Sequence, residues 1–308
     1  MSLPTPNSPP IQNVALVGLG AIGILYAAQI SACQSRFLRI VADAARIARY
    51  QADPPSFNGQ RLDLNYVTPE NPGPPADLVL VAVKSTALRA SIPVIASVTG
   101  AHTQILPLLN GISAQDILAE AFGWSRILHG FVYCQSSMRT GNAVVQGGGD
   151  KLIFGEAINT PPSARVRAVA AFFERLGIRH DVPADMRAAQ WKKYILNIGI
   201  NQAQAVLRRP NGGLQNDPEA MQYARDLMNE AAAVGAALGV AGVNEVPAWA
   251  EGVILKASPE NRTSMLQDIE AGRVPEIDIF AETVCRLGRE HGIPTPANDR
   301  ALRALSPA

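Results

Sequence analysis

The sequence predicts an α/β domain with a mostly parallel sheet over residues 1–183, followed by an all-helical domain over residues 184–308. In the first part, short and continuously apolar runs alternate with helical patterns, as in parallel sheets whose strands are buried on both faces. From Ala184 onward the pattern is helical with almost no strand signal, so we place the domain boundary near Pro183. Residues 1–11 are rich in proline and polar residues, and we expect a disordered lead-in there.

The elements of the first domain follow from these runs and from the turn residues between them. Asn58-Gly59 lies between two short segments and predicts a hairpin turn. The run Gly147–Asp150 lacks the Lys-Ser/Thr and the helix of a phosphate loop, so we interpret it as a bend within a hairpin. We expect strands at Val14–Val17, Phe37–Ala42, Asp77–Val83, Thr103–Leu109, Arg126–Met138, Ala143–Glu156 and Ile178–Val182, and helices at Ala44–Ala52, Ala87–Val98 and Ala164–Leu176.

Three glycines, Gly18, Gly20 and Gly23, stand between the first predicted strand and a helical stretch. In such a unit the first glycine permits the tight turn, the second lets a pyrophosphate approach the backbone, and the third lets the helix pack against the strand. The amides at the helix start, at Ala21 and Ile22, then face the phosphates. Because both flanks are present, the motif predicts a Rossmann-type dinucleotide site rather than a merely structural turn.

Polar residues follow three further predicted strands. Asp43 stands about 20 residues after the last glycine, where dinucleotide folds meet the adenosine ribose, and Arg46 follows on a short helix. Lys84 and Asn110 end two other strands, and ligands bind outside the carboxyl edge of open parallel sheets. From position alone, Lys84 is explained equally well as a solvated strand end, and Asn110 as a turn former beside Gly111.

Composition argues against several classes of protein. The net charge of +1 gives no electrostatic case for binding nucleic acid or an anionic membrane. No apolar run approaches the roughly 18 to 20 residues that span a bilayer, and the start of the chain lacks the pattern of a signal peptide. Three cysteines far apart indicate reduced thiols in a cytoplasmic protein, and four histidines lack metal-ligand spacing, so we expect no metal site.

A long apolar helix predicted from Ala184 to about Leu207 is interrupted by Lys193, Asn197 and Asn201. Their spacing of i, i+4 and i+8 places them on one helix face. If this face were buried in the core, the three side chains would need hydrogen-bond partners, because an unpaired buried amide costs about 1 to 3 kcal/mol. A solvent-facing stripe is the alternative, although exposed helix faces favour residues of better helix propensity than Asn. We therefore expect a polar face that lines a ligand cleft.

Two helix starts farther along the chain carry polar residues of interest. The segment Thr263–Gln267 has the pattern of a capping box and contains Ser264. Pro275 and Glu276 stand at the predicted first turn of a helix that continues over Ile277–Gly292. Read alone, both features are explained as helix caps.

Taken together, these stretches resemble the ketopantoate reductase (2-dehydropantoate 2-reductase) family over nearly the whole chain. The resemblance implies a Rossmann-type domain and an all-helical domain with the active site in the cleft between them, and NAD(P)H-dependent reduction of 2-dehydropantoate (ketopantoate) to pantoate. The matching pieces, of which the last two are the most specific, are Gly18–Gly23, Val81–Lys84, Leu109–Gly111, Trp191–Lys193 with Asn197 and Asn201, and Thr263–Asp268 leading to Glu276.

The resemblance also assigns roles. Lys193 matches the general acid that protonates the keto oxygen while NAD(P)H delivers hydride to the carbon. Glu276 matches the acid that interacts with this lysine and with the substrate hydroxyl. The other matches hold the substrate, at Asn197, Asn201 and Ser264, or lie near the nicotinamide, at Lys84 and Asn110.

The cofactor and the substrate stay open at this point. The family resemblance implies NADP(H), but Asp43 favours the free ribose diol of NAD(H), while Arg46 is placed to hold a phosphate. A reductase of another small 2-oxo or 3-oxo acid is the alternative, because related dehydrogenases also place Lys and Asn four apart. A non-catalytic dinucleotide sensor would have lost Lys193 or Glu276, and both are present. A homodimer is compatible with all of these readings.

Overall fold

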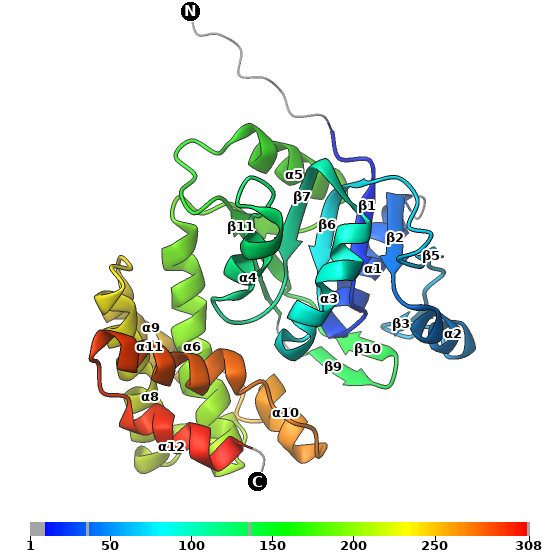
Figure 1. The fold of residues 1–308 in the computed structure, drawn as a ribbon. Helices are drawn as coiled ribbons and strands as arrows, with labels where there is room; N and C mark the ends of the chain where they lie inside the picture. The colour runs from blue at the N-terminus through cyan, green and yellow to red at the C-terminus, as the bar shows by residue number, and fades with distance from the viewer. Residues whose placement is uncertain (1–9, 35–36, 135–136, 307–308) are drawn as a thin grey trace, which may run out of the picture. The chain divides into compact units, whose positions relative to one another are not determined.

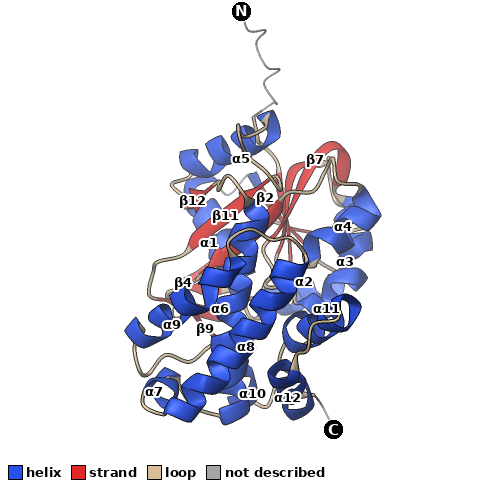
Figure 2. Cartoon of the chain, turned by 90° about the vertical axis from the view of Figure 1, so that its left-hand side faces the viewer, coloured by secondary structure: helices blue, strands red, loops and turns tan. Residues whose placement is uncertain are grey.

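The chain divides into two compact units, Met1–Met186 and Arg187–Ala308, in a computed structural model that describes residues 10–34, 37–134 and 137–306. Residues 1–9 of the predicted lead-in lie outside the described residues. Among the described residues, every strand belongs to the first unit, and the second unit is helical (Figure 2). The predicted fold class, a parallel α/β domain followed by an all-helical one, is confirmed.

The first unit is organised around a five-stranded parallel sheet (Figure 1). Its strands lie in the order β5 (Tyr66–Val67), β2 (Leu38–Val41), β1 (Val14–Val17), β6 (Ala76–Val81) and β7 (Thr99–Pro107). The chain moves outward from β1 to β2 on one side and then returns to add β6 on the other. This reversal beside β1 is the switch point at which open α/β sheets bind their ligands.

Alternate residues of the strands enter two different apolar layers. Leu16 of β1 packs in one cluster with Ile24 of α1 (Ala21–Gln34) and with residues of α5 (Ala164–Arg175). Val17 packs in the other with Leu88 of α3 (Ser85–Ser97) and with residues of α4 (Ala114–Phe122). Because both faces are covered, all residues of β1 are buried, which explains the continuously apolar strand sequence. The remaining helix of this unit is α2 (Ala44–Ala52).

Two smaller sheets complete the unit. One has the order β4 (Gln60–Arg61), β3 (Ser56–Phe57), β10 (Ala143–Gln146) and β9 (Ser137–Thr140), and the other the order β12 (His180–Asp181), β11 (Lys151–Gly155) and β8 (His129–Tyr133). The predicted hairpin turn is confirmed: Asn58 and Gly59 take φ values of 48° and 80° between β3 and β4.

The later strands form the predicted hairpin, but its pairing is interrupted. β9 pairs antiparallel with β10 next to the turn at Gly141, and β8 pairs antiparallel with β11 farther from that turn. The two segments predicted as strands, Arg126–Met138 and Ala143–Glu156, are therefore partners, although each is divided between two sheets. Gly147–Asp150 connects β10 to β11 and is the bend that we expected within the hairpin. Residues 135 and 136 of the first segment lie outside the described residues.

The second unit is built on the long helix α6 (Met186–Leu207) and on α8 (Pro218–Ala237). The two helices approach closely at two glycines. A Cβ on Gly199 would lie 2.4 Å from Cγ of Met228, and a Cβ on Gly235 would lie 2.9 Å from Cε3 of Trp191. The other helical elements are α7 (Asn211–Gln215), the 3₁₀ turn Val243–Glu245, α9 (Val246–Lys256), α10 (Ser264–Glu270), a π-helical turn Asp278–Glu282, α11 (Thr283–His291) and α12 (Pro296–Leu305).

Candidate active site

The glycine-rich turn has the geometry that its sequence predicts. Gly18 has a φ of +100°, and a Cβ there would lie 2.6 Å from the carbonyl oxygen of Ala82. A Cβ on Gly23 would lie 2.1 Å from the carbonyl oxygen of Gly18, so a side chain would push α1 off the turn. Both positions therefore require glycine for the close approach of β1, α1 and the end of β6.

Gly20 differs from the other two glycines because a Cβ placed there would make only ordinary van der Waals contacts. The atoms nearest to a Cβ placed there are the Ala82 carbonyl oxygen at 3.7 Å and Nη1 of Arg139 at 3.9 Å. The first helical hydrogen bond of α1 joins the Ile24 amide to the Gly20 carbonyl at 2.9 Å, so the amides of Ala21 and Ile22 precede it. The first turn of α1 contains no acidic residue. Such a helix start is suited to an anion.

The parallel sheet brings the other predicted cofactor residues to the same edge. Gly18, Asp43, Lys84 and Asn110 each follow the carboxyl end of a strand, and these four strands, β1, β2, β6 and β7, are adjacent and parallel. Lys84 is exposed and immediately precedes α3, and Asn110 is half-buried in the turn before α4. The edge therefore gathers a glycine-rich turn, a carboxylate, an ammonium and an amide.

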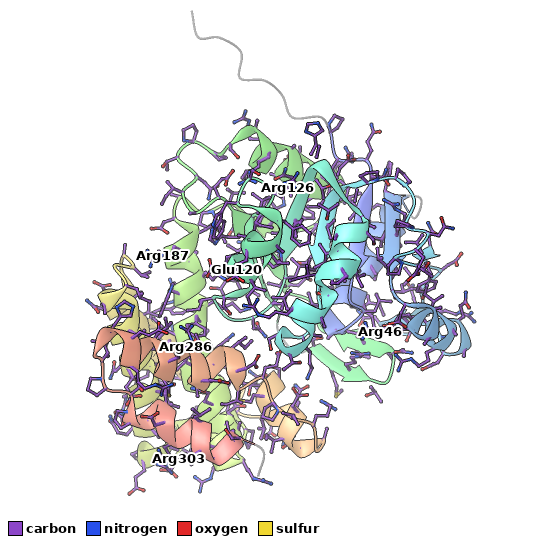
Figure 3. The ribbon with its side chains drawn as sticks, in the orientation of Figure 1. Arg46, Glu120, Arg126, Arg187, Arg286 and Arg303 are labelled. Atoms are coloured by element: carbon purple, nitrogen blue, oxygen red, sulfur yellow. The ribbon has the colours of Figure 1, made fainter. Side chains whose placement is uncertain are left out.

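Asp43 has two contacts at this edge. Its Oδ1 accepts a hydrogen bond from the Arg46 amide at 2.7 Å, which caps α2, and its Oδ2 lies 3.4 Å from Nε of Arg46. Both side chains are about half exposed, and Figure 3 labels Arg46 at the start of α2. The carboxylate thus holds a guanidinium beside itself, at the place where the sequence predicts the adenosine ribose.

In the second unit, the predicted polar face lies on α6. Asn201 is buried, with 6% of its surface exposed, while Lys193 and Asn197 are half-buried. Tyr194, next to Lys193, donates a hydrogen bond to the Phe280 carbonyl at 3.1 Å and stacks on the Phe280 ring. Burial raises the pKa of the Tyr194 phenol, so it stays protonated and remains a donor.

The segments that carry Ser264 and Glu276 are both attached to α6. Oε1 of Gln204 accepts a hydrogen bond from the Thr263 amide at 2.9 Å, directly before Ser264 at the start of α10. The Tyr194–Phe280 contact attaches the segment that follows Glu276. One helix therefore supports the backbone of both segments.

The capping-box interpretation is wrong, and the helix after Glu276 begins later than predicted. Thr263 precedes α10 without a side-chain cap bond, and Nε2 of Gln267 donates to the Arg262 carbonyl rather than to the start of the helix. The Gln204 side chain takes the amide that the capping box would have used. Glu276 precedes the helical residues, which begin with the π turn at Asp278 and not at Ile277.

Sequence reasoning missed Gln204 and Tyr194 as supports of the site. Gln204 is fully buried and lies seven residues after Asn197, on the same side of α6, so helical spacing could have found it. Tyr194 offered no such signal, because a buried tyrosine on an apolar helix has the pattern of ordinary core. Its partner is a backbone carbonyl that the sequence cannot identify.

Some further features bear on chemistry. Within the described residues, Cys33, Cys134 and Cys285 take part in no disulfide bond. Within residues 10–34, 37–134 and 137–306, no group of three or more His, Cys, Asp or Glu side chains is arranged to hold a metal ion. None of the described helices combines the length and apolar character needed to cross a membrane.

Comparison with known proteins identifies the family of the chain. The model of the ketopantoate reductase PanE/ApbA family matches residues 14–159, and the model of its C-terminal part matches residues 185–307. The 2-dehydropantoate 2-reductase of Halobacterium salinarum is 31% identical over 224 residues, which cover 72% of each chain. The chain belongs to the ketopantoate reductase family. It is an oxidoreductase that uses a pyridine nucleotide.

Solved structures extend the similarity to the fold. The crystal structure of 2-dehydropantoate 2-reductase from Geobacter metallireducens has a TM-score of 0.81 and 26% identity, covering 95% of this chain and 98% of that one. A D-mandelate dehydrogenase solved with NADH and anilino(oxo)acetate has a TM-score of 0.83 at 21% identity, covering 95% of this chain and 97% of that one. The fold of this family member is thus shared with a dehydrogenase named for a different substrate.

Proposed function

We propose that this ketopantoate reductase family member reduces 2-dehydropantoate to pantoate with NAD(P)H. The observation that carries the proposal is the half-buried face of α6, on which Lys193, Asn197 and Asn201 lie at successive i+4 positions. A lysine and two amides provide one proton donor and several hydrogen-bond groups for an oxygen-rich acid. The relatives named 2-dehydropantoate 2-reductase support this choice of substrate.

In the proposed mechanism, the residues of this chain bind the substrate and move one proton. The chemistry that a bound reduced nicotinamide would supply is a hydride for the keto carbon. The keto oxygen then gains negative charge, which the Lys193 ammonium stabilises and neutralises by donating its proton. Glu276 favours the protonated lysine and accepts a hydrogen bond from the substrate hydroxyl. Asn197, Asn201 and Ser264 bind the remaining oxygen atoms of the substrate.

For the cofactor, we propose that the first unit binds the dinucleotide at the carboxyl edge of its sheet. The amides of Ala21 and Ile22 would hold the pyrophosphate in front of Gly20, with Lys84 and Asn110 at the nicotinamide end. Asp43 and Arg46 favour opposite cofactors: the carboxylate suits a ribose diol and repels a 2′-phosphate, and the guanidinium suits the phosphate. We infer that NADH is used at least as well as NADPH is.

The test is to measure the oxidation of NADH and of NADPH with 2-dehydropantoate as the substrate and with each of a panel of other 2-oxo and 3-oxo acids. The proposal predicts the highest kcat/KM for 2-dehydropantoate. A higher value for an acid without the hydroxyl group would favour the alternative, a reductase of another small oxo acid, for which the shared fold of D-mandelate dehydrogenase leaves room. Absence of turnover with cofactor still bound would favour a dinucleotide sensor.

Two further proposals concern the state of the protein. We infer a cytoplasmic location, because the spacing of the three cysteines does not suggest a disulfide framework and the proposed reaction consumes reduced nicotinamide. We also propose a homodimer, which sedimentation velocity measured over a range of protein concentrations would test.

A further inference from the structure

The positively charged side chain of Arg139 lies beside the glycine-rich turn, although Arg139 is far from the turn in sequence and belongs to another sheet. Nη1 of Arg139 is 3.9 Å from the position of a Cβ on Gly20, and it is the side-chain atom nearest to that position. Arg139 is on β9, an edge strand of the four-stranded sheet. Figure 1 shows the β9–β10 hairpin below the main sheet, at the end where β1 runs into α1, and the hairpin strands contact α1.

The strand register explains why Arg139 faces the turn. Arg139 pairs with Val144 across the hairpin, and paired residues project from the same face. Val144 is buried in the apolar cluster that contains Leu19 and Ile24, so this face is directed at α1. The neighbouring pair, Met138 and Val145, projects from the opposite face, and both side chains are largely exposed.

The side chain is also held in a defined direction while it stays accessible. Nε of Arg139 donates to the Gly141 carbonyl at 2.8 Å, which fixes one edge of the guanidinium on its own turn. The other edge reaches towards Gly20, and the residue as a whole is exposed. An anion that approaches the amides of Ala21 and Ile22 would therefore meet a guanidinium already in place, and little side-chain entropy would be lost on binding.

We propose that Arg139 binds the pyrophosphate of the dinucleotide cofactor, opposite the helix start of α1. This inference rests on the proposed function, since it assumes that the glycine-rich turn binds a dinucleotide. The pyrophosphate is common to NADH and NADPH, so Arg139 strengthens the binding of both. It therefore acts differently from Arg46, whose position suits the 2′-phosphate that only NADPH carries.

The experiment measures the dissociation constants of NADH, NADPH and ADP-ribose for the wild type, Arg139→Gln and Arg139→Lys. We expect Arg139→Gln to weaken all three ligands by about tenfold, the loss of one charge-assisted hydrogen bond. Arg139→Lys should restore most of the affinity, because it keeps the charge. Arg61→Gln is the matched control: it removes an exposed arginine from β4, at the opposite edge of the same sheet, and should leave all three constants unchanged.

Several results would overturn the inference. A change of less than twofold for every ligand would remove Arg139 from the site, and a loss confined to NADPH would assign it to the 2′-phosphate. Equal losses in the Gln and Lys variants, together with a lower Tm without ligand, would mean that Arg139 only stabilises its turn. If the wild type bound none of the three ligands, the proposed function itself would fail, and the inference with it.

Discussion

Glu156 and Arg165 form a partly buried ion pair in the first unit, and its removal should destabilise that unit in a pH-dependent way. The guanidinium contacts both carboxylate oxygens, and its Nη1 also donates to the Ser125 carbonyl at 2.5 Å. The two side chains are only 19% and 27% exposed, for Arg165 and Glu156 respectively. Glu156→Gln keeps the shape of the side chain but removes its charge, leaving the arginine without its counter-ion.

The size of the effect follows from these contacts. Hydrogen bonds to a charged group are worth about 1.5 to 3 kcal/mol each, and part of that is offset by desolvation and by the remaining exposure. We expect a loss of about 2 kcal/mol in the free energy of unfolding at pH 7, or roughly 4 to 8 °C in Tm for a unit of this size. Urea unfolding followed by circular dichroism measures this difference.

The pKa of Glu156 determines how the contribution of this ion pair to stability changes with pH. Burial alone would raise the pKa of Glu156, but hydrogen bonds from Arg165 and Ser163 outweigh it and hold the pKa below its usual value. A carboxyl whose pKa is lowered by folding stabilises the protein fully above its unfolded pKa, and this contribution is lost as pH falls through the folded pKa. The stability difference between wild type and Glu156→Gln should therefore shrink below about pH 4.

Glu120→Gln is the matched control for this prediction. Glu120, labelled in Figure 3, pairs with Arg89 at 3.2 Å, but both side chains are about two-thirds exposed. An ion pair of this kind contributes about 0 to 1 kcal/mol, so the control should change little. The reasoning would be refuted if Glu156→Gln lowered the free energy of unfolding no more than Glu120→Gln does. It would also be refuted if the loss caused by Glu156→Gln were the same at pH 3.5 as at pH 7.

Three predictions concern activity. Lys193→Ala should lower kcat by a factor of about 10² to 10⁴ and leave cofactor affinity unchanged. The control variant Lys192→Ala, which removes a lysine stacked over Trp249, should leave kcat unchanged. A kcat near the wild-type value in Lys193→Ala would exclude Lys193 as the acid. Glu276→Gln should reduce kcat/KM more for 2-dehydropantoate than for a 2-oxo acid without the hydroxyl, and equal losses would limit Glu276 to supporting the lysine. Asp43→Ser should shift the ratio of kcat/KM values towards NADPH and Arg46→Ala should shift it back; a hundredfold preference of the wild type for NADPH would contradict our account of this pair.

The parts of the fold that the sequence predicts are those with local causes. The glycine-rich turn is predictable because steric contacts within a few residues require Gly18 and Gly23, and the buried strands because both faces of the main sheet are covered. The parallel pairing of β10 with β3 was not predicted, because it joins segments that are far apart in the sequence.

The candidate site shows the same division. The polar face of α6 can be read from helical spacing, since one helix carries all of it. Helical spacing also places Gln204 on that side of α6, but the partner of Gln204 and the position of Arg139 cannot be read from it, because a group on another element completes each arrangement. In the first case the partner is a backbone amide, which has no sequence signature at all.

The cap that Asp43 provides for α2 limits which residues can replace Asp43 when cofactor preference evolves in this protein. A residue at this position must accept a hydrogen bond from the Arg46 amide, so Asp, Asn, Ser and Thr preserve the helix start, whereas Ala costs about 1 kcal/mol. Three of these four residues carry no charge and would no longer repel a 2′-phosphate. The change from Asp to Asn needs a single base substitution, so a lineage can pass from one cofactor to the other without an unstable intermediate, with Arg46 already in position to receive the phosphate.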